Sequence, residues 1–184
     1  MRVFSVVAAV CFLCTAPAHT QTAESNVYTT EAQRQYQYIQ GLILKSAEKV
    51  GEELYAFKPT PAVRSLAGVL GHIADANMLL CGVASGKPVD FEKIMKDLSS
   101  VQVHEKKTSK TEIIAALKES SAFCDSVFTT LTDATGREQV SWFGGEKTAK
   151  LMVLNMSTSH AWEHYGNLVT YMRLKDIVPP SSER

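Results

Sequence analysis

The sequence predicts an all-α protein, a four-helix bundle with a long crossover between its second and third helices. Four long segments carry apolar residues at helical spacings, no run alternates apolar and polar residues as strands do, and no internal repeat occurs. The chain has 184 residues, of which 45% are hydrophobic and 21% charged, which suits one domain with its own core. We place the bundle at residues 28–180, followed by a tail at 181–184.

The first helix is expected over residues 29–54. Its apolar side chains recur every three or four residues, at Tyr36, Ile39, Ile43, Ala47 and Val50. Two prolines, at positions 59 and 61, then disfavour helix in the residues before them.

The second helix is expected from Ser65, as its N-cap, to about Ala84. Gly68 and Gly71 weaken this helix locally and permit a neighbouring helix to approach closely. A polar linker follows to about residue 107, with one short helical turn over residues 91–98.

The third helix opens with the capping-box spacing Ser109-x-x-Glu112 and continues to about Leu131. An irregular turn is expected at Trp142-Phe143-Gly144-Gly145. Thr148 is then the expected cap of the fourth helix, which runs to about Lys175.

The first 18 residues have the pattern of a signal peptide. Arg2 precedes an apolar run over residues 3–14, and Ala16-Pro17-Ala18 offers a cleavage site after Ala18. Cys11 and Cys14 lack the small preceding residue of a lipoprotein signal. The alternative is a buried N-terminal strand or helix. We expect an exported protein, periplasmic or secreted, in which residues 19–27 are disordered.

The charge balance argues against some partners. The chain has 19 basic and 19 acidic residues and no basic block, so nucleic-acid binding has no electrostatic support. Nothing indicates a membrane association after the signal peptide is removed, because no other stretch has the ~18 continuous apolar residues of a transmembrane helix.

Three of the five histidines indicate a metal site. His160 and His164 are four residues apart in the fourth predicted helix, so both rings leave one face of that helix. His72, in the second predicted helix, is the natural third ligand. Three imidazoles and an open position form a catalytic type of zinc site, and nickel, iron or copper would also suit them. The alternative is a set of ordinary, partly buried histidines.

Two acidic residues are expected around this site. Asp75, one turn after His72, and Glu163 could accept hydrogen bonds that fix the imidazole tautomers. Ser157, Tyr165 or Asp75 could handle protons.

Two stretches resemble the DinB-like superfamily. The segment from His160-Ala-Trp-Glu-His164 to Pro180 resembles its C-terminal helix, and Phe57-Lys-Pro-Thr-Pro61 with Gly71-His72-Ile-Ala-Asp75 resembles its N-terminal half. The resemblance covers residues 28–180. It implies a four-helix bundle in which three histidines, here His72, His160 and His164, hold a divalent metal. Relatives include metal-dependent transferases and isomerases that act on low-molecular-weight thiols. The signal peptide departs from those cytosolic relatives.

Two functions remain open from the sequence. The first is a metal-dependent hydrolase or transferase, of unknown small-molecule substrate, that activates water or a thiol. The second is a non-catalytic metal-binding or stress-associated protein. The sequence contains no Ser-His-Asp pattern and no glycine-rich phosphate loop.

Two further expectations concern cysteines and assembly. Cys81 and Cys124 remain after signal cleavage and form either a disulfide or two buried thiols. The resemblance implies a homodimer through bundle helices, for which Tyr36, Tyr38 and Leu42 are candidates. The alternative is that these side chains fill the bundle's own core.

Overall fold

The computed structural model describes residues 26–183 and confirms the all-α bundle. The predicted signal peptide, residues 1–18, lies outside the described residues, as does most of the segment predicted as disordered. The four long helices are α1 (Val27–Lys49), α2 (Leu66–Ala84), α4 (Lys110–Thr130) and α5 (Lys150–Arg173). The shorter elements are a helix α3 (Phe91–Lys96) and the strands β1 (Gln139–Ser141) and β2 (Lys147–Ala149).

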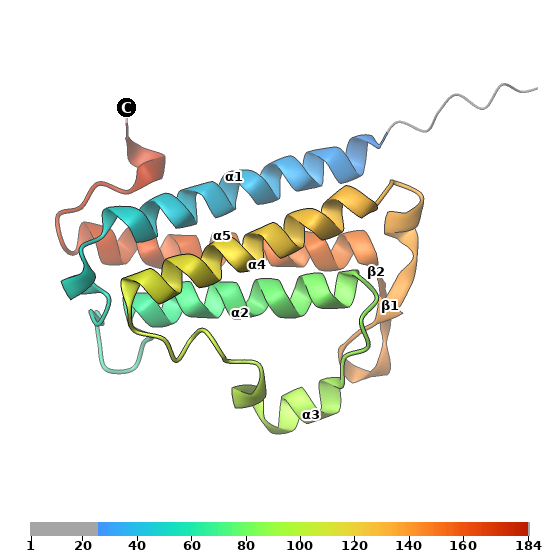
Figure 1. Ribbon diagram of the computed structural model, residues 1–184, viewed down its shortest axis with the longest axis horizontal. Coiled ribbons are helices and arrows are strands. Elements are labelled where there is room, and N and C mark those ends of the chain that lie inside the picture. The colour runs from blue at the N-terminus through green and yellow to red at the C-terminus, as the bar shows by residue number, and fades with distance from the viewer. Residues whose placement is uncertain (1–25, 184) are drawn as a thin grey trace, which may run out of the picture.

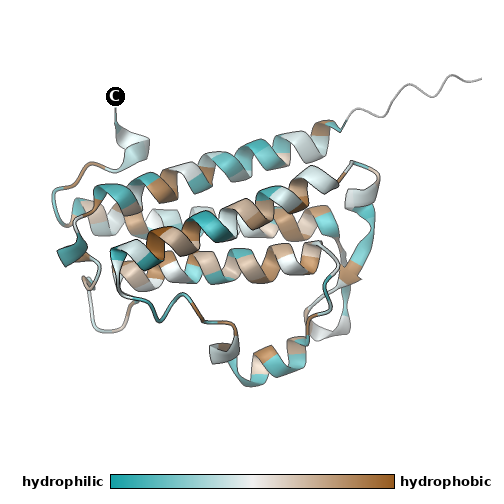
Figure 2. Cartoon of the chain, viewed as in Figure 1, coloured by the Kyte–Doolittle hydropathy of each residue, from teal (hydrophilic) through white to brown (hydrophobic). Residues whose placement is uncertain are grey.

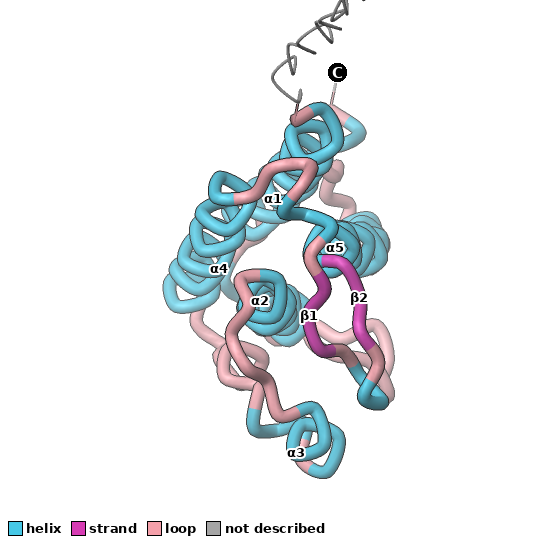
Figure 3. The backbone as a smooth tube through the Cα atoms, turned by 90° about the vertical axis from the view of Figure 1, so that its right-hand side faces the viewer, coloured by secondary structure: helices cyan, strands magenta, loops and turns pink. Residues whose placement is uncertain are grey.

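The helices occupy the corners of a square (Figures 1 and 3). Helices α1 and α2 each pack against both α4 and α5, so α1 lies diagonally opposite α2, and α4 lies diagonally opposite α5. Figure 1 shows that α2 and α4 run in the same direction, because the crossover that contains α3 returns the chain to the starting end of the bundle. Helix α5 runs antiparallel to α2. This arrangement brings the middle of α5 beside the first half of α2.

Helix α2 forms the centre of the core. Fifteen of its 19 residues are buried, and Figure 2 shows it as the most continuously apolar of the long helices. It is the one helix among the described residues with the length and composition of a membrane span, but 78% of that window is buried inside the bundle. Core helices of soluble proteins have the same composition.

Helix α1 ends five residues before the predicted position. Val50 and Gly51 have extended backbones, and a short 3-10 turn follows at Glu52–Leu54. The last carbonyls of the helix have partners that the periodicity could not reveal. The Tyr55 hydroxyl donates to the Ala47 carbonyl at 2.8 Å, and the Lys110 ammonium donates to the Val50 carbonyl at 2.7 Å.

Of the two serines predicted to cap α2 and α4, one makes a capping hydrogen bond and the other does not. The Ser65 side chain accepts the Gly68 N–H at 3.0 Å, which confirms the start of α2. Helix α4 also begins where predicted, but the Ser109 side chain makes no capping hydrogen bond. The predicted capping box is therefore wrong. The start of α4 is held by Lys110, which reaches the end of α1, and by the fully buried Ile113.

A β-hairpin precedes α5 where the sequence predicts only an irregular turn. Strands β1 and β2 are antiparallel, and Thr148 pairs with Val140 instead of capping the helix. The turn between them contains Gly144 and Gly145, with φ of 70° and 77°. Glycine adopts this conformation without a steric penalty. Strands of three residues are too short to show an alternating pattern.

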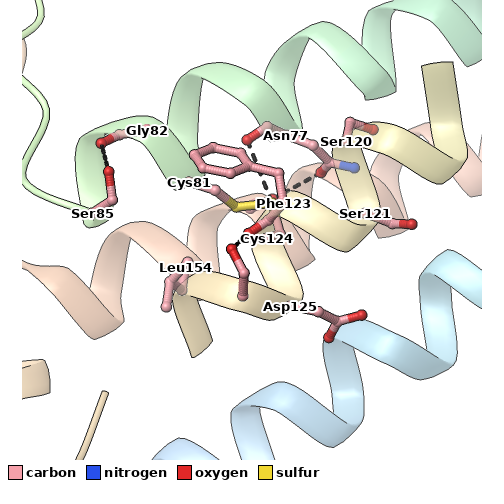
Figure 4. Close-up of a disulfide and its surroundings, with 12 residues drawn as sticks. Asn77, Cys81, Gly82, Ser85, Ser120, Ser121, Phe123, Cys124, Asp125 and Leu154 are labelled. Carbon is pink, nitrogen blue, oxygen red and sulfur yellow. Dashed lines mark hydrogen bonds between the residues drawn. A yellow bond between two sulfur atoms is a disulfide. The ribbon is translucent and has the colours of Figure 1, made fainter. Parts of the chain in front are cut away.

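A disulfide joins the parallel helices α2 and α4. Cys81 and Cys124 are bonded, with their Cα atoms 5.2 Å apart (Figure 4). Both side chains are fully buried. The disulfide that the sequence left open against two free thiols is confirmed.

The three residues proposed for a dimer interface lie in different environments. Tyr36 is completely buried against Phe128, and Leu42 is 7% exposed, so both belong to the core of their own bundle. Only Tyr38, at 60% exposure, projects from the surface. The homodimer stays a prediction.

Candidate metal centre

Three histidine rings meet between α2 and α5. The Nε2 atom of His160 lies 3.2 Å from that of His72 and 3.0 Å from that of His164. All three candidate ligand atoms lie within 4.8 Å of one another. His160 and His164 share one face of α5 because they are one turn apart, and the antiparallel α2 presents His72 to that face.

The spacing of these nitrogens suits one divalent ion. Two nitrogens that are each ~2.0–2.1 Å from a shared ion lie roughly 2.8–3.4 Å apart when the angle at the ion is between about 90° and 110°. The separations of 3.2 and 3.0 Å fall in that range. The third pair, His72 and His164, lies within 4.8 Å, so small ring movements would let all three residues share one ion. Imidazole suits zinc, nickel, iron and copper.

Burial holds the three rings in their neutral forms. Burial, and after it the neighbouring His164, lowers the pKa of His160 to about 4. Burial also lowers the pKa of His72 and of His164, with the Arg64 charge as the next cause for His72. A neutral imidazole has a lone pair with which to bind a metal. At neutral pH the three side chains are therefore in the form that binds a cation.

Glu105, from the crossover between α3 and α4, orients His72. Its Oε2 atom lies 3.2 Å from His72 Nδ1, and its Oε1 atom accepts the Arg64 Nε–H at 2.7 Å. A proton on Nδ1 that is donated to Glu105 leaves Nε2 free for a metal. Arg64 is positioned in turn by α5, since the Tyr171 hydroxyl donates to its carbonyl at 2.9 Å.

Asp75 acts on the site indirectly, which corrects its predicted contact with a histidine. Its buried carboxylate accepts the backbone N–H groups of Val103, His104 and Glu105, at 2.9–3.1 Å. These bonds use its acceptor sites and fix the segment that carries Glu105. Asp75 therefore positions the residue that positions His72.

Gly71 allows this segment to lie against α2. A Cβ atom at this position would be 2.3 Å from the His104 carbonyl oxygen and 2.8 Å from the Glu105 Cα. No side chain can be accommodated that close to backbone atoms. The sequence predicts a close approach at this glycine, but the neighbour is the crossover and not another helix.

Glu163 does not hold a histidine, in contrast to the prediction. It is exposed, and within residues 26–183 it makes no hydrogen bond to any of the three rings. Its charge only opposes the lowering of the pKa values of His160 and His164. The partner of His164 is the Asn167 amide, 3.2 Å from Nδ1. The atom placed at this distance is Nδ2; if the amide is turned by 180°, its oxygen accepts the Nδ1 proton instead.

Two residues considered for proton transfer lie away from the histidines. The Ser157 hydroxyl is buried and donates to the Asn77 Oδ1 atom at 3.0 Å. The Tyr165 hydroxyl accepts the Ser181 N–H at 3.1 Å. Both are structural. Glu105 is the carboxylate in direct contact with the histidine cluster.

An apolar cleft of about 310 Å³ adjoins the histidines, and its lining includes His72, His160 and Arg64. Most of the remaining lining is apolar and comes from α2, α3, the crossover, the hairpin turn and α5: Leu79, Ile94, Met95, Leu98, Phe143 and Met156. Another hollow, of about 450 Å³, lies beside β1 and contains no histidine.

Aromatic contacts join α3 to the hairpin at this cleft. The Phe91 ring lies 4.3 Å from the Phe143 ring and 5.9 Å from the Trp142 ring, measured between centroids. Helix α3 and the β1–β2 hairpin, which the sequence pattern predicts only as a short turn and an irregular turn, thus complete the wall of the cleft.

A sequence profile described as the DinB superfamily matches residues 35–168. The chain belongs to the DinB superfamily. Two similar solved structures are DinB-like proteins from Bacillus cereus and Bacillus subtilis, each 18% identical. The first has a TM-score of 0.65 and covers 82% of this chain and 95% of its own. The second has a TM-score of 0.64 and covers 84% and 99%. These likenesses show a shared fold.

A third structure is the mycothiol-dependent maleylpyruvate isomerase. It is 12% identical to this DinB chain, with a TM-score of 0.61, and the match covers 76% of this chain and 60% of that one. The comparison with curated proteins gave no match.

Sequence reasoning missed Glu105, Asn167 and the cleft. Glu105 lies in a polar linker with no periodicity, and only the hydrogen bonds of Asp75 bring it to His72. Asn167 was detectable in principle, because it follows His164 by three residues on the same helix.

Proposed function

We propose that this DinB-superfamily protein is an exported, metal-dependent enzyme, a hydrolase or a transferase. The observation that carries the proposal is the position of the three converging Nε2 atoms beside an apolar cleft. Two of the three histidines, His72 and His160, line that cleft. A small molecule in the cleft would therefore lie next to the metal-binding atoms.

The roles of the residues follow from their contacts. His72, His160 and His164 would hold the ion through Nε2. A bound divalent ion acts as a Lewis acid and lowers the pKa of a coordinated water or thiol toward ~7. Glu105 keeps the proton of His72 on Nδ1, Asn167 would do the same for His164 with its amide oxygen facing the ring, and the apolar side chains exclude bulk water.

Zinc is the first candidate metal, because three imidazoles with an open position are typical of catalytic zinc. Nickel, iron or copper would suit the same ligands. The proposal of export rests on the N-terminal sequence pattern, and the disulfide supports it because such bonds persist in oxidising compartments. The name of the mycothiol-dependent neighbour keeps a thiol among the candidate nucleophiles.

A non-catalytic role in metal storage or stress is the alternative. It would be favoured if the three rings were sealed from ligands by protein atoms. His72 and His160 are instead partly exposed and line a cleft of about 310 Å³, which favours the enzyme.

Metal content and turnover test the proposal together. Untagged protein should contain one ion per chain, and His160→Ala should lose it. Ser159→Ala changes the exposed neighbouring side chain and should retain the ion. The loaded protein should hydrolyse 4-nitrophenyl esters, or transfer a thiol to an electrophile, in a reaction that EDTA abolishes. Full metal occupancy without metal-dependent turnover of either substrate type would favour the alternative.

A further inference from the structure

We propose that the cleft beside the histidines binds a small carboxylic acid with an apolar body, of about the size of octanoate. This inference deepens the proposed function by naming a ligand class. It rests on that function only for a reaction at the metal ion. Binding of the ligand depends on the side chains that line the cleft and does not require the ion.

The volume of the cleft sets the size of the ligand. The cleft has about 310 Å³, and a water-sized group takes about 30 Å³ of liquid volume. The cleft therefore holds about ten non-hydrogen atoms, which is near the lower limit of ligand sites. Larger ligands, such as peptides, would extend out of the cleft.

The lining sets the character of the ligand's body. Leu79, Ile94 and Phe143 form apolar walls, and Met95 and Leu98, which also line the cleft, are 66% and 54% exposed. Large apolar side chains that are exposed beside a cleft lose contact with water when an apolar ligand enters. Methionine adapts its shape to such a ligand.

Arg64 offers hydrogen-bond donors to the head group. Its Nε is held by Glu105, whereas within residues 26–183 its two terminal nitrogens donate no hydrogen bond. A guanidinium with free terminal nitrogens binds a carboxylate through paired hydrogen bonds. The one carboxylate in the lining, that of Asp75, already accepts three backbone N–H groups. Imidazole ligands carry no negative charge, so they would not neutralise a bound ion. The positive charge of that ion would also attract an anion.

The binding assay uses the fluorescence of Trp142, which packs 5.0 Å from the Phe143 ring. The other tryptophan, Trp162, is removed as Trp162→Phe, so that the emission reports on the cleft alone. Metal-free protein is titrated with butanoate, hexanoate, octanoate and octan-1-ol. The affinity of the acids should rise about fourfold per added methylene, the value expected for burial of that group. Octan-1-ol should bind at least tenfold more weakly than octanoate.

Three variants identify the residues responsible. Met156→Glu places a charge in the lining and should weaken octanoate binding at least tenfold. Met152→Glu, one turn earlier on α5, is exposed outside the cleft and should bind octanoate normally. Arg64→Gln should weaken octanoate but not octan-1-ol. Circular dichroism checks that each variant is folded.

The outcomes separate this inference from the metal proposal. Equal affinity for butanoate and octanoate, or equal effects of Met156→Glu and Met152→Glu, would overturn it. Equal affinity for octanoate and octan-1-ol would overturn the carboxylate assignment. The metal proposal is tested separately: a protein that cannot be loaded with a metal but still shows the chain-length dependence would retain the cleft and lose the proposed metal function.

Discussion

The Nδ1 atom of His72 lies 3.2 Å from the Oε2 atom of Glu105, although the two residues are 33 positions apart in the chain. This contact links the crossover to the histidine cluster. It favours the tautomer of His72 whose Nε2 atom is free to bind a metal.

Loss of the Glu105 carboxylate should weaken metal binding. We expect Glu105→Ala to lower the affinity about 10- to 100-fold, the usual effect of removing a group that orients a ligand histidine. Glu105→Gln, which can still accept a hydrogen bond, should have a smaller effect. Competition with a chromophoric chelator measures both. Glu92→Ala, on the exposed side of α3, is the control. An affinity for Glu105→Ala equal to that of this control would refute the role of Glu105.

Gly71→Ala should disturb the site without touching a ligand. The new Cβ atom would collide with the His104 carbonyl, 2.3 Å away, and displace the segment that carries Glu105. We expect a loss of about 1–3 kcal/mol in the free energy of unfolding, and weaker metal binding.

Gly82→Ala is the matched control on the same helix. A Cβ atom there meets nothing within 4 Å, so alanine should stabilise α2 by up to about 1 kcal/mol. Urea denaturation measures both variants. If Gly71→Ala and Gly82→Ala had similar free energies of unfolding, the crossover would have to move away from the added methyl group without a measurable loss of stability.

Acid should destabilise the metal-free protein. The pKa of His160 is about 4 in the folded state and near 6.5 in the unfolded chain, so between these values only the unfolded chain binds the proton. The full contribution of His160 to stability is present above pH 6.5 and is lost as the pH falls toward 4. His160→Ala should therefore show a smaller loss of stability over this range. Urea denaturation in EDTA at several pH values measures the difference, and parallel curves for the two proteins would contradict the assignment.

Reduction of the disulfide should lower the thermal stability. Cys81 and Cys124 are 43 residues apart, and closing a loop of that length stabilises by about 3–4 kcal/mol on the chain-entropy model. For a domain of this size the melting temperature should fall on the order of 10 °C. Cys81→Ala/Cys124→Ala should melt at that lower temperature with or without a reductant. An unchanged melting temperature of the native protein after complete reduction would contradict the estimate.

The sequence predicts the parts of the site that helical periodicity controls. His160 and His164 share a face because of their spacing, and the family resemblance adds His72. Glu105 was not predictable, because its place depends on hydrogen bonds between Asp75 and backbone groups about 30 residues later.

The ends of the helices and the hairpin also depend on contacts that local sequence patterns do not reveal. Lys110 holds the end of α1 from another helix, and a hairpin of two three-residue strands is too short to leave a pattern. The roles of Glu163 and Ser109 failed for a related reason. Helical spacing places a residue on a face but does not decide which partner its side chain finds.

Anomalous diffraction at the metal absorption edge tests the central claim most directly. Crystals of the metal-loaded protein should show one strong peak per chain, ~2.0–2.2 Å from the Nε2 atoms of His72, His160 and His164. A chain with no peak at this position, or with its only peak at other residues, would contradict the proposed metal centre.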